Sequence, residues 1–166
     1  MEKMRIEWAK EADAAEVYAL YHSLIDAPYS TWSEDYPSRE LVFDDVRRGK
    51  TIVMRNQNDQ IVSAIALLDA EDEPEFDQIA LWYRDTEKWA VPARLGVCRE
   101  MQGRGIAKKM LQAAMDMAKE EGCGGVRFLV SKRNPVAQRA YQALSFDICG
   151  EARMWEEDWL CYQKRL

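Results

Sequence analysis

Apolar residues recur with two different periods along the first half of the chain. Residues 4–9, 50–56 and 60–69 are runs rich in β-branched and other apolar side chains, which favour strands. The polar tripeptide between the last two runs predicts a hairpin. Residues 11–25 and 39–49 carry apolar side chains at mostly helical spacing, and the second of these segments follows a serine that can cap it.

The same alternation continues with two more strands. The segment WAVPARLGV (89–97) predicts a strand that is irregular or bulged, because it contains Pro92. The segment GVRFLVS (125–131) is a continuous apolar run, which is typical of a buried central strand.

Two helices and a closing pair of strands complete the pattern. Apolar side chains share one face of a helix predicted over 104–121, and Asn134 caps a second helix that begins with proline. Residues 146–153 and 159–166 predict strands around a loop at 154–158. We find no repeat or linker, so we expect one α+β domain over residues 1–166.

Composition and charge narrow the class of protein. Hydrophobic residues make up 48% and charged residues 31%, which is typical of a soluble globular protein. The net charge of -6 argues against a nucleic-acid partner. No apolar run is long enough to cross a membrane and the N-terminus does not resemble a signal peptide, so a cytoplasmic protein is expected.

The cysteines and the histidine do not suggest a metal site. The only histidine is His22, and the cysteines are scattered without a CxxC pair at Cys98, Cys123, Cys149 and Cys161. A structural zinc site needs closely spaced ligands of these types. We therefore predict no metal and expect reduced thiols.

Two glycines at the start of the 104–121 helix need an explanation, because glycine destabilises helices. Gly103 and Gly105 lie between a predicted strand and that helix, where unpaired amide groups form a natural anion site. A tight turn without a ligand is the alternative. Ile106 follows the second glycine where a Walker loop needs lysine, and Lys108 occupies the third glycine position of a dinucleotide motif, so neither nucleotide motif fits.

Taken whole, LGVCREMQGRGIAKKML resembles the acyl-CoA-binding motif of the GCN5-related N-acetyltransferase (GNAT) superfamily, Q/R-x-x-G-x-G/A. The downstream segment NPVAQRAYQALSF resembles the second signature of that family, with matches at Asn134, Ala137, Tyr141 and Phe146. Ser145 departs from it, because glycine usually ends that helix. The resemblance spans nearly the whole chain and implies a mixed, mostly antiparallel sheet flanked by about four helices.

The resemblance also implies a site for acetyl-CoA. The backbone amides of residues 103–108 would hold the pyrophosphate, and residues 95–97 would pair with the pantetheine arm beside the predicted bulge. Asn134 would bind the arm as well. The implied cofactor-binding residues are Leu95, Gly96, Val97, Gln102, Gly103, Arg104, Gly105, Ile106, Ala107, Lys108, Asn134, Ala137 and Tyr141.

The implied reaction is direct attack of a primary amine, on a small molecule or a peptide, on the acetyl thioester. Tyr141 is the catalytic candidate, as proton donor to the departing thiolate, and packing in the core is its alternative role. The general base is open between Glu87, Glu156 and Glu157, each of which can also be a surface acid.

The acceptor amine is not identified by the sequence. Trp32, Tyr36 and Trp155 lie in loops that build the acceptor pocket in this family, and Arg94 could bind a carboxylate of the substrate. The acidic run from Asp69 to Asp77 could steer a cationic amine or be a solvated loop.

Three functions compete. The first is an acetyl-CoA-dependent N-acetyltransferase, and the resemblance allows a homodimer. The second is a catalytically silent acyl-CoA-binding domain, against which the retention of Tyr141 argues. The third is another small nucleotide-binding protein, which the absence of both nucleotide motifs disfavours.

Overall fold

The protein is described here from a computed structural model, in which residues 3–75, 82 and 88–166 are described. Its main elements, in chain order, are β1 (Arg5–Trp8), α1 (Ala14–Ser23), α2 (Arg39–Arg47), β2 (Thr51–Arg55), β3 (Ile61–Asp69), β4 (Trp89–Val97), α3 (Ile106–Glu120), β5 (Gly125–Ser131), α4 (Pro135–Gln142), β6 (Asp147–Met154) and β7 (Glu157–Arg165).

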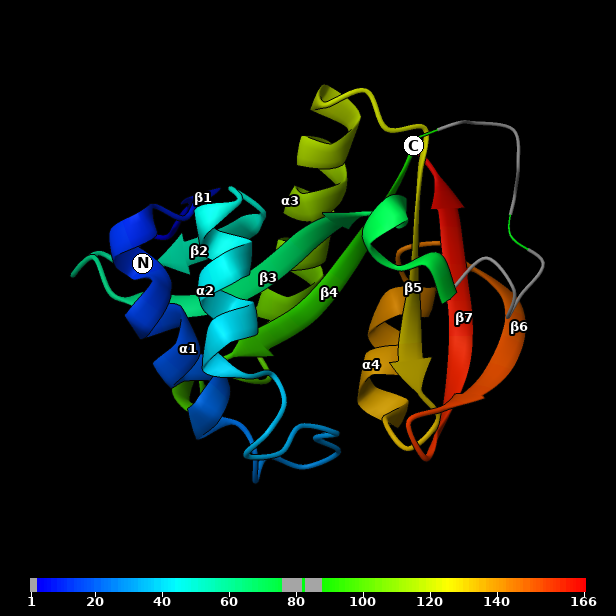
Figure 1. Cartoon of the computed structure of the whole chain (residues 1–166), viewed down its shortest axis with the longest axis horizontal. Helices are drawn as coiled ribbons and strands as arrows, with labels where there is room; N and C mark the ends of the chain where they lie inside the picture. The colour runs from blue at the N-terminus through cyan, green and yellow to red at the C-terminus, as the bar shows by residue number, and fades with distance from the viewer. Residues whose placement is uncertain (1–2, 76–81, 83–87) are drawn as a thin grey trace. The chain divides into compact units, whose positions relative to one another are not determined.

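The strands form a seven-stranded sheet in the order β1-β2-β3-β4-β5-β7-β6 (Figure 1). The pairs β1–β2, β2–β3, β5–β7 and β6–β7 are antiparallel, whereas β4 and β5 are parallel. The prediction of a mixed, mostly antiparallel sheet with about four helices is therefore confirmed in the described part of the chain.

The chain divides into two compact units. Unit 1 comprises Met1–Leu67 and Ala93–Ala114, and unit 2 comprises Leu68–Pro92 and Met115–Leu166. The elements β3, β4 and α3 contribute residues to both units. The single domain expected over residues 1–166 stays a prediction.

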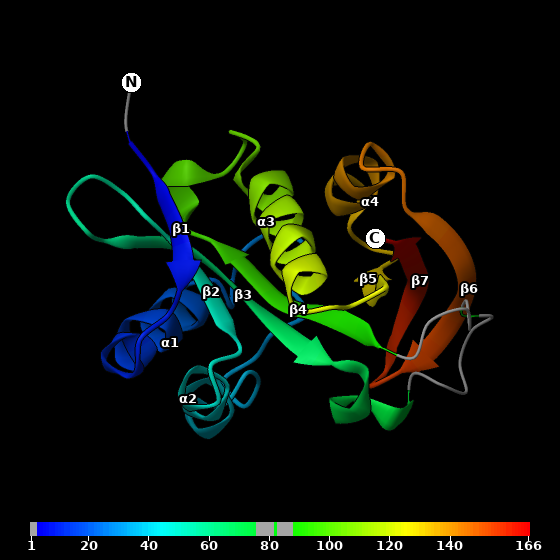
Figure 2. The same ribbon diagram turned by 90° about the horizontal axis from the view of Figure 1, so that it is seen from above.

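Unit 1 places two helices over its strands. Figure 2 shows α1 and α2 on one face of these strands and the first half of α3 on the other. Val17 and Tyr21 of α1 pack with Val42 and Val46 of α2 in a buried cluster that also includes Val53 of β2. As predicted, Ser38 caps α2, because its hydroxyl accepts a hydrogen bond from the Leu41 amide at 3.1 Å.

Unit 2 has an aromatic core. Phe128 of β5 contacts Phe146 edge to face at 4.9 Å between ring centroids, and it stacks on Tyr162 of β7 at 5.8 Å. Trp89 of β4 covers Gly125 so closely that a β-carbon there would lie 2.2 Å from the indole Cζ3. Glycine at this position lets the indole lie flat on the strand.

Two boundaries differ from the sequence-based expectation. The helix predicted from residue 104 begins at Ile106, because Gly105 has a left-handed φ of 78° that an α-helix cannot contain. The loop predicted over 154–158 is shorter, since Met154 pairs with Glu157 and leaves a turn of two residues. Both residues of that turn, Trp155 and Glu156, have left-handed φ values of 52° and 60°.

Candidate acyl-CoA site

The end of β4 is held by side chains from other parts of unit 1. The Gly96 carbonyl accepts a hydrogen bond from the Ser63 hydroxyl at 2.7 Å, and the Val97 carbonyl accepts one from Nε2 of Gln102 at 3.0 Å. A β-carbon on Gly96 would lie 3.0 Å from ring and methyl carbons of Tyr21 and Leu24. A larger residue at position 96 would therefore have to displace side chains of α1 and of the residue that follows it.

The irregularity predicted for β4 is at Arg94, which has a left-handed φ of 53°. Non-glycine residues adopt this conformation rarely. The proline that suggested a bulge lies two residues earlier, within the strand.

The loop after β4 turns the chain into α3. Gly103 and Gly105 both have φ of 78°, and a β-carbon on either would meet no atom within 4 Å. Backbone conformation is thus sufficient to explain both glycines. The open space around them leaves the loop accessible.

The start of α3 offers a row of unpaired donors. In the described part of the chain, no hydrogen-bond acceptor pairs with the amide N–H groups of residues 103–108. The first amide that bonds within the helix is that of Lys109, which donates to the Gly105 carbonyl at 3.2 Å. The exposed side chains of Arg104 and Lys108 add positive charge to the helix N-terminus. This arrangement fits an anion such as a pyrophosphate.

Two of the predicted acceptor residues are in contact in unit 1. Arg94 Nη1 donates to the Tyr36 hydroxyl at 3.3 Å, while Nε and Nη2 of the same guanidinium donate to Oδ2 of Asp45 at 2.9 and 2.7 Å. Burial raises the pKa of the Asp45 carboxyl, and the charge of Arg94 opposes that rise. Trp32 lies edge to face against Tyr21, with 5.1 Å between ring centroids.

The buried Asp45 was not found by the sequence reasoning. One signal was available, because this acid lies in α2 between the buried Val42 and Val46, on the apolar face of the helix. A buried carboxylate requires a partner, and that partner is 49 positions away in the chain.

Unit 2 contains the residues of the second signature. The Asn134 side chain accepts a hydrogen bond from the Ala137 amide at 2.9 Å, so the predicted cap of α4 is present. Tyr141 packs edge to face on Phe128 at 5.3 Å, and burial raises the pKa of its hydroxyl to about 12. Within the described residues the Tyr141 hydroxyl has no hydrogen-bond partner. Its hydroxyl is therefore protonated at neutral pH and free to donate.

Ser145 replaces the usual glycine after α4 and adopts the left-handed conformation itself, with φ of 65°. Lys164 of β7 donates to the Leu144 carbonyl at 2.6 Å beside it. A side chain from β7 thereby satisfies a carbonyl at the end of the helix.

The candidate bases differ in their surroundings. Glu157 accepts hydrogen bonds from Nε and Nη2 of Arg133 at 2.8 and 2.7 Å and from the Ser131 hydroxyl at 3.0 Å. The Arg133 hydrogen bonds lower its pKa, which weakens Glu157 as a base. Glu156 is exposed at the hairpin turn. Glu87 lies outside the described residues, as does Asp77 at the end of the acidic run.

The comparisons with known proteins agree with this geometry. The model of the acetyltransferase (GNAT) family matches residues 17–146. The chain belongs to this family. The comparison with curated proteins found no match.

Solved GNAT structures share the fold at low sequence identity. A GNAT acetyltransferase from Streptococcus agalactiae is 22% identical and superposes with a TM-score of 0.80 over 98% of this chain and 95% of its own. The structure of yncA from Salmonella typhimurium with its cofactor acetyl-CoA is 16% identical, with a TM-score of 0.75 over 99% and 94% of the two chains. A chain of the NatC complex bound to Gag peptide and CoA is 17% identical, with a TM-score of 0.74 over 99% of each chain.

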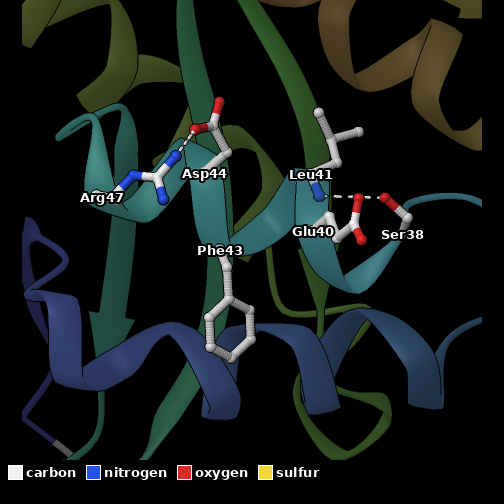
Figure 3. Close-up of a pocket in the computed structure, with 6 residues that line it drawn as sticks. All are labelled: Ser38, Glu40, Leu41, Phe43, Asp44 and Arg47. Atoms are coloured by element: carbon white, nitrogen blue, oxygen red, sulfur yellow. Dashed lines mark hydrogen bonds and ion pairs between the residues drawn. The ribbon is translucent and has the colours of Figure 1, made fainter.

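The surface of this GNAT protein also has an open depression on α2, away from the glycine loop in sequence. Figure 3 shows its lining residues, which are Ser38, Glu40, Leu41, Phe43, Asp44 and Arg47. Two of its charged residues, Arg47 and Asp44, form an ion pair along the helix. None of the predicted site residues lines this depression.

Two further observations concern other classes of site. Among the described residues, no three histidine, cysteine or acidic side chains gather as a metal site would require. No helix in that part of the chain is both long and apolar enough to span a membrane.

Proposed function

We propose that this GNAT protein is an N-acetyltransferase that transfers the acetyl group of acetyl-CoA to a primary amine on a small molecule or a peptide. The observation that carries the proposal is the row of unpaired amides at residues 103–108, at the position of the family's acyl-CoA motif. One similar structure contains acetyl-CoA and another contains CoA with a peptide, which supports both halves of the proposal.

Residues of unit 1 would hold the donor. The amides of residues 103–108 suit the pyrophosphate, and the exposed Arg104 and Lys108 complement its charge. Gln102 shapes the loop through its bond to the Val97 carbonyl. The main chain of residues 95–97 would pair with the pantetheine arm in the manner of an added strand. In unit 2, Asn134 and Ala137 would contribute through the second signature.

Bound acetyl-CoA supplies an activated acetyl thioester to the reaction. The attacking amine, with a pKa of about 10, must lose a proton first. Tyr141 is protonated at neutral pH, and burial raises its pKa further, to about 12. Complete proton transfer from Tyr141 to a thiolate with a pKa of ~8.5 would be uphill by about 5 kcal/mol. We therefore assign Tyr141 first as a hydrogen-bond donor that stabilises charge on sulfur.

The acceptor site is proposed to include Trp32, Tyr36 and Trp155. Tyr36 and Trp155 are exposed at 45% and 64%, and aromatic surface of this kind suits contact with a ligand. The role of Arg94 in binding a substrate carboxylate stays a prediction, as do the homodimer and the cytoplasmic location. Asp45 already neutralises the Arg94 charge.

The first experiment is a calorimetric titration with acetyl-CoA, with ATP and NAD as controls. We expect selective binding of acetyl-CoA that Gly105→Glu abolishes, because the new carboxylate repels the pyrophosphate in the loop. Gly49→Glu is the matched control. Gly49 has a left-handed φ of 71° and, like Gly105, no atom within 4 Å of a β-carbon. The two variants therefore share the conformational strain and differ in position.

Three outcomes are informative. Undiminished affinity in Gly105→Glu would remove the loop from the cofactor site. Equal loss in both glycine variants would show a general effect of strain. If acetyl-CoA binds but no acetyl transfer occurs to a broad panel of amines, the protein is a silent acyl-CoA-binding domain instead of an enzyme.

A further inference from the structure

Three of the last four residues of β4, Arg94, Gly96 and Val97, are restrained by side chains of unit 1. Ser63 of β3 holds Gly96, and Gln102 holds Val97. The remaining restraint is the buried ion pair between Arg94 and Asp45, which neither of the two motifs includes. This pair connects the last turn of α2 to the strand that is proposed to receive the pantetheine arm.

The ion pair is almost completely buried. The Arg94 and Asp45 side chains are only 5% and 4% exposed. Arg94 as a whole residue is nevertheless half-buried, so its exposed surface belongs largely to the main chain. The Arg94 side chain is therefore buried, whereas its main chain at the left-handed turn is exposed and a ligand can reach it.

Stability alone is a weak explanation for such a pair. Removing two charges from water costs about as much free energy as their attraction returns, and apolar replacements of similar size are often neutral or stabilising. The left-handed φ of Arg94 adds roughly 1–2 kcal/mol of strain, because its β-carbon crowds the backbone. The buried ion pair and the left-handed φ are both unfavourable and occur at the same residue, which suggests that Arg94 meets a functional requirement and not one of stability.

The conformation of Arg94 sets the course of the strand after it. A change in the backbone conformation of Arg94 would reorient the amides and carbonyls of residues 95–97, because successive residues of a strand point to opposite faces. If Arg94 relaxed to an extended conformation, its guanidinium would leave Asp45 unpaired in the core. The charge on Asp45 therefore opposes that relaxation.

We infer that Asp45 is a positioning residue: through Arg94 it fixes the left-handed turn of β4 and so aims the main chain of residues 95–97 at the pantetheine arm of acyl-CoA. This inference rests on the proposed function. It assigns to α2 a part in donor binding, although no residue of α2 needs to touch the donor.

The test compares two ligands on the same variants. Acetyl-CoA would use both the glycine loop and residues 95–97, whereas 3′-phospho-ADP lacks the pantetheine arm and would use the loop without the strand. We expect Asp45→Asn to weaken acetyl-CoA binding about tenfold, or ~1.4 kcal/mol, and to leave the affinity for 3′-phospho-ADP within about twofold. Asp44→Asn is the control, since Asp44 is the adjacent acid on α2 and is 40% exposed. It should change neither affinity.

A double variant separates positioning from folding. Asp45→Leu combined with Arg94→Met removes the pair without leaving a buried charge, so it should melt near the wild-type temperature. We expect it to bind 3′-phospho-ADP normally and acetyl-CoA weakly. Normal acetyl-CoA binding by this variant would overturn the inference, as would equal weakening of both ligands in Asp45→Asn. A wild-type protein that binds neither ligand would instead overturn the proposed function.

Discussion

Tyr141 illustrates how a motif residue can also be an ordinary core residue. Its ring packs edge to face on Phe128, as the ring of a structural tyrosine would. Its hydroxyl, however, has no partner within the described part of the chain, so it is available to donate a hydrogen bond to a ligand atom.

Replacing Tyr141 with phenylalanine should therefore reduce turnover and leave donor binding intact. We expect kcat to fall about 10²-fold, the lower end of the range for losing one hydrogen-bond donor to a developing negative charge, while the dissociation constant for acetyl-CoA changes less than about twofold. Steady-state kinetics and calorimetry measure the two quantities. Tyr162→Phe is the control, because Tyr162 is a second tyrosine that packs on Phe128. An unchanged kcat in Tyr141→Phe would remove this residue from the mechanism.

The hairpin between β6 and β7 has a turn that its sequence does not favour. A two-residue turn whose central residues both have positive φ is usually built from Asn-Gly, yet here the residues are Trp155 and Glu156. Trp155 is 64% exposed, and its ring lies edge to face against that of Trp159, with 6.0 Å between the ring centroids. A strained turn that presents an exposed tryptophan is the pattern expected of a contact residue.

Replacing Trp155-Glu156 by Asn-Gly should stabilise the protein and weaken acceptor binding. Relief of two left-handed residues is expected to add about 2 kcal/mol, or ~4–8 °C in melting temperature. The KM for the amine should rise while the affinity for acetyl-CoA stays the same. Glu156→Gly alone keeps the tryptophan, so it should give about half the stabilisation with an unchanged KM. A normal KM in the double variant would exclude Trp155 from the acceptor site.

Signals within a few residues of one another predicted most helices and strands. The features that the sequence did not predict depend on contacts between residues far apart in the chain. Asn134 followed by proline fixed the start of α4, because a cap and an N1 proline act within one turn. The left-handed residues Arg94 and Trp155 gave no such signal, since glycine usually marks this conformation. The pairing of Arg94 with Asp45 depends on packing between elements far apart in sequence, which periodicity does not encode.

The candidate site likewise combines residues that local motifs predict with residues that only distant contacts reveal. The two motifs identified the glycine loop and Tyr141 by type and spacing, and the structure adds unpaired amides and an unpartnered hydroxyl within the residues it describes. Of the residues that hold β4 in place, Gln102 belongs to the first motif, whereas Ser63 and Asp45 belong to neither. Ser63 and Asp45 act through contacts with the strand, so only the folded chain reveals them.

For the whole molecule, charge balance predicts how stability depends on pH. The chain has 29 acidic and 23 basic side chains, so protonation of its carboxylates leaves an excess of positive charge. Glu157 and Asp13 are carboxyls in the described part of the chain whose pKa values are lowered. Hydrogen bonds from Arg133 lower the pKa of Glu157. For Asp13, burial acts to raise the pKa, but the hydrogen bonds from Arg55 and Lys10 together outweigh it.

The lowered pKa values determine the direction in which stability changes with pH. A carboxyl with a lowered pKa in the folded state stabilises the protein above its unfolded pKa, and that contribution disappears as the pH falls through the folded pKa. For Glu157 the loss of this stabilisation begins as the pH falls below the ordinary carboxyl pKa of 4.5.

Glu157→Gln should therefore lower the melting temperature at pH 7, and the difference from wild type should disappear as the pH falls below about 4.5. Glu156→Gln removes the adjacent exposed carboxylate and should give no such pH-dependent gap. Thermal melts of the wild type and the two variants from neutral to acidic pH measure this difference in melting temperature. A difference for Glu157→Gln that persists in acid would show that hydrogen-bond geometry, and not charge, supports the hairpin.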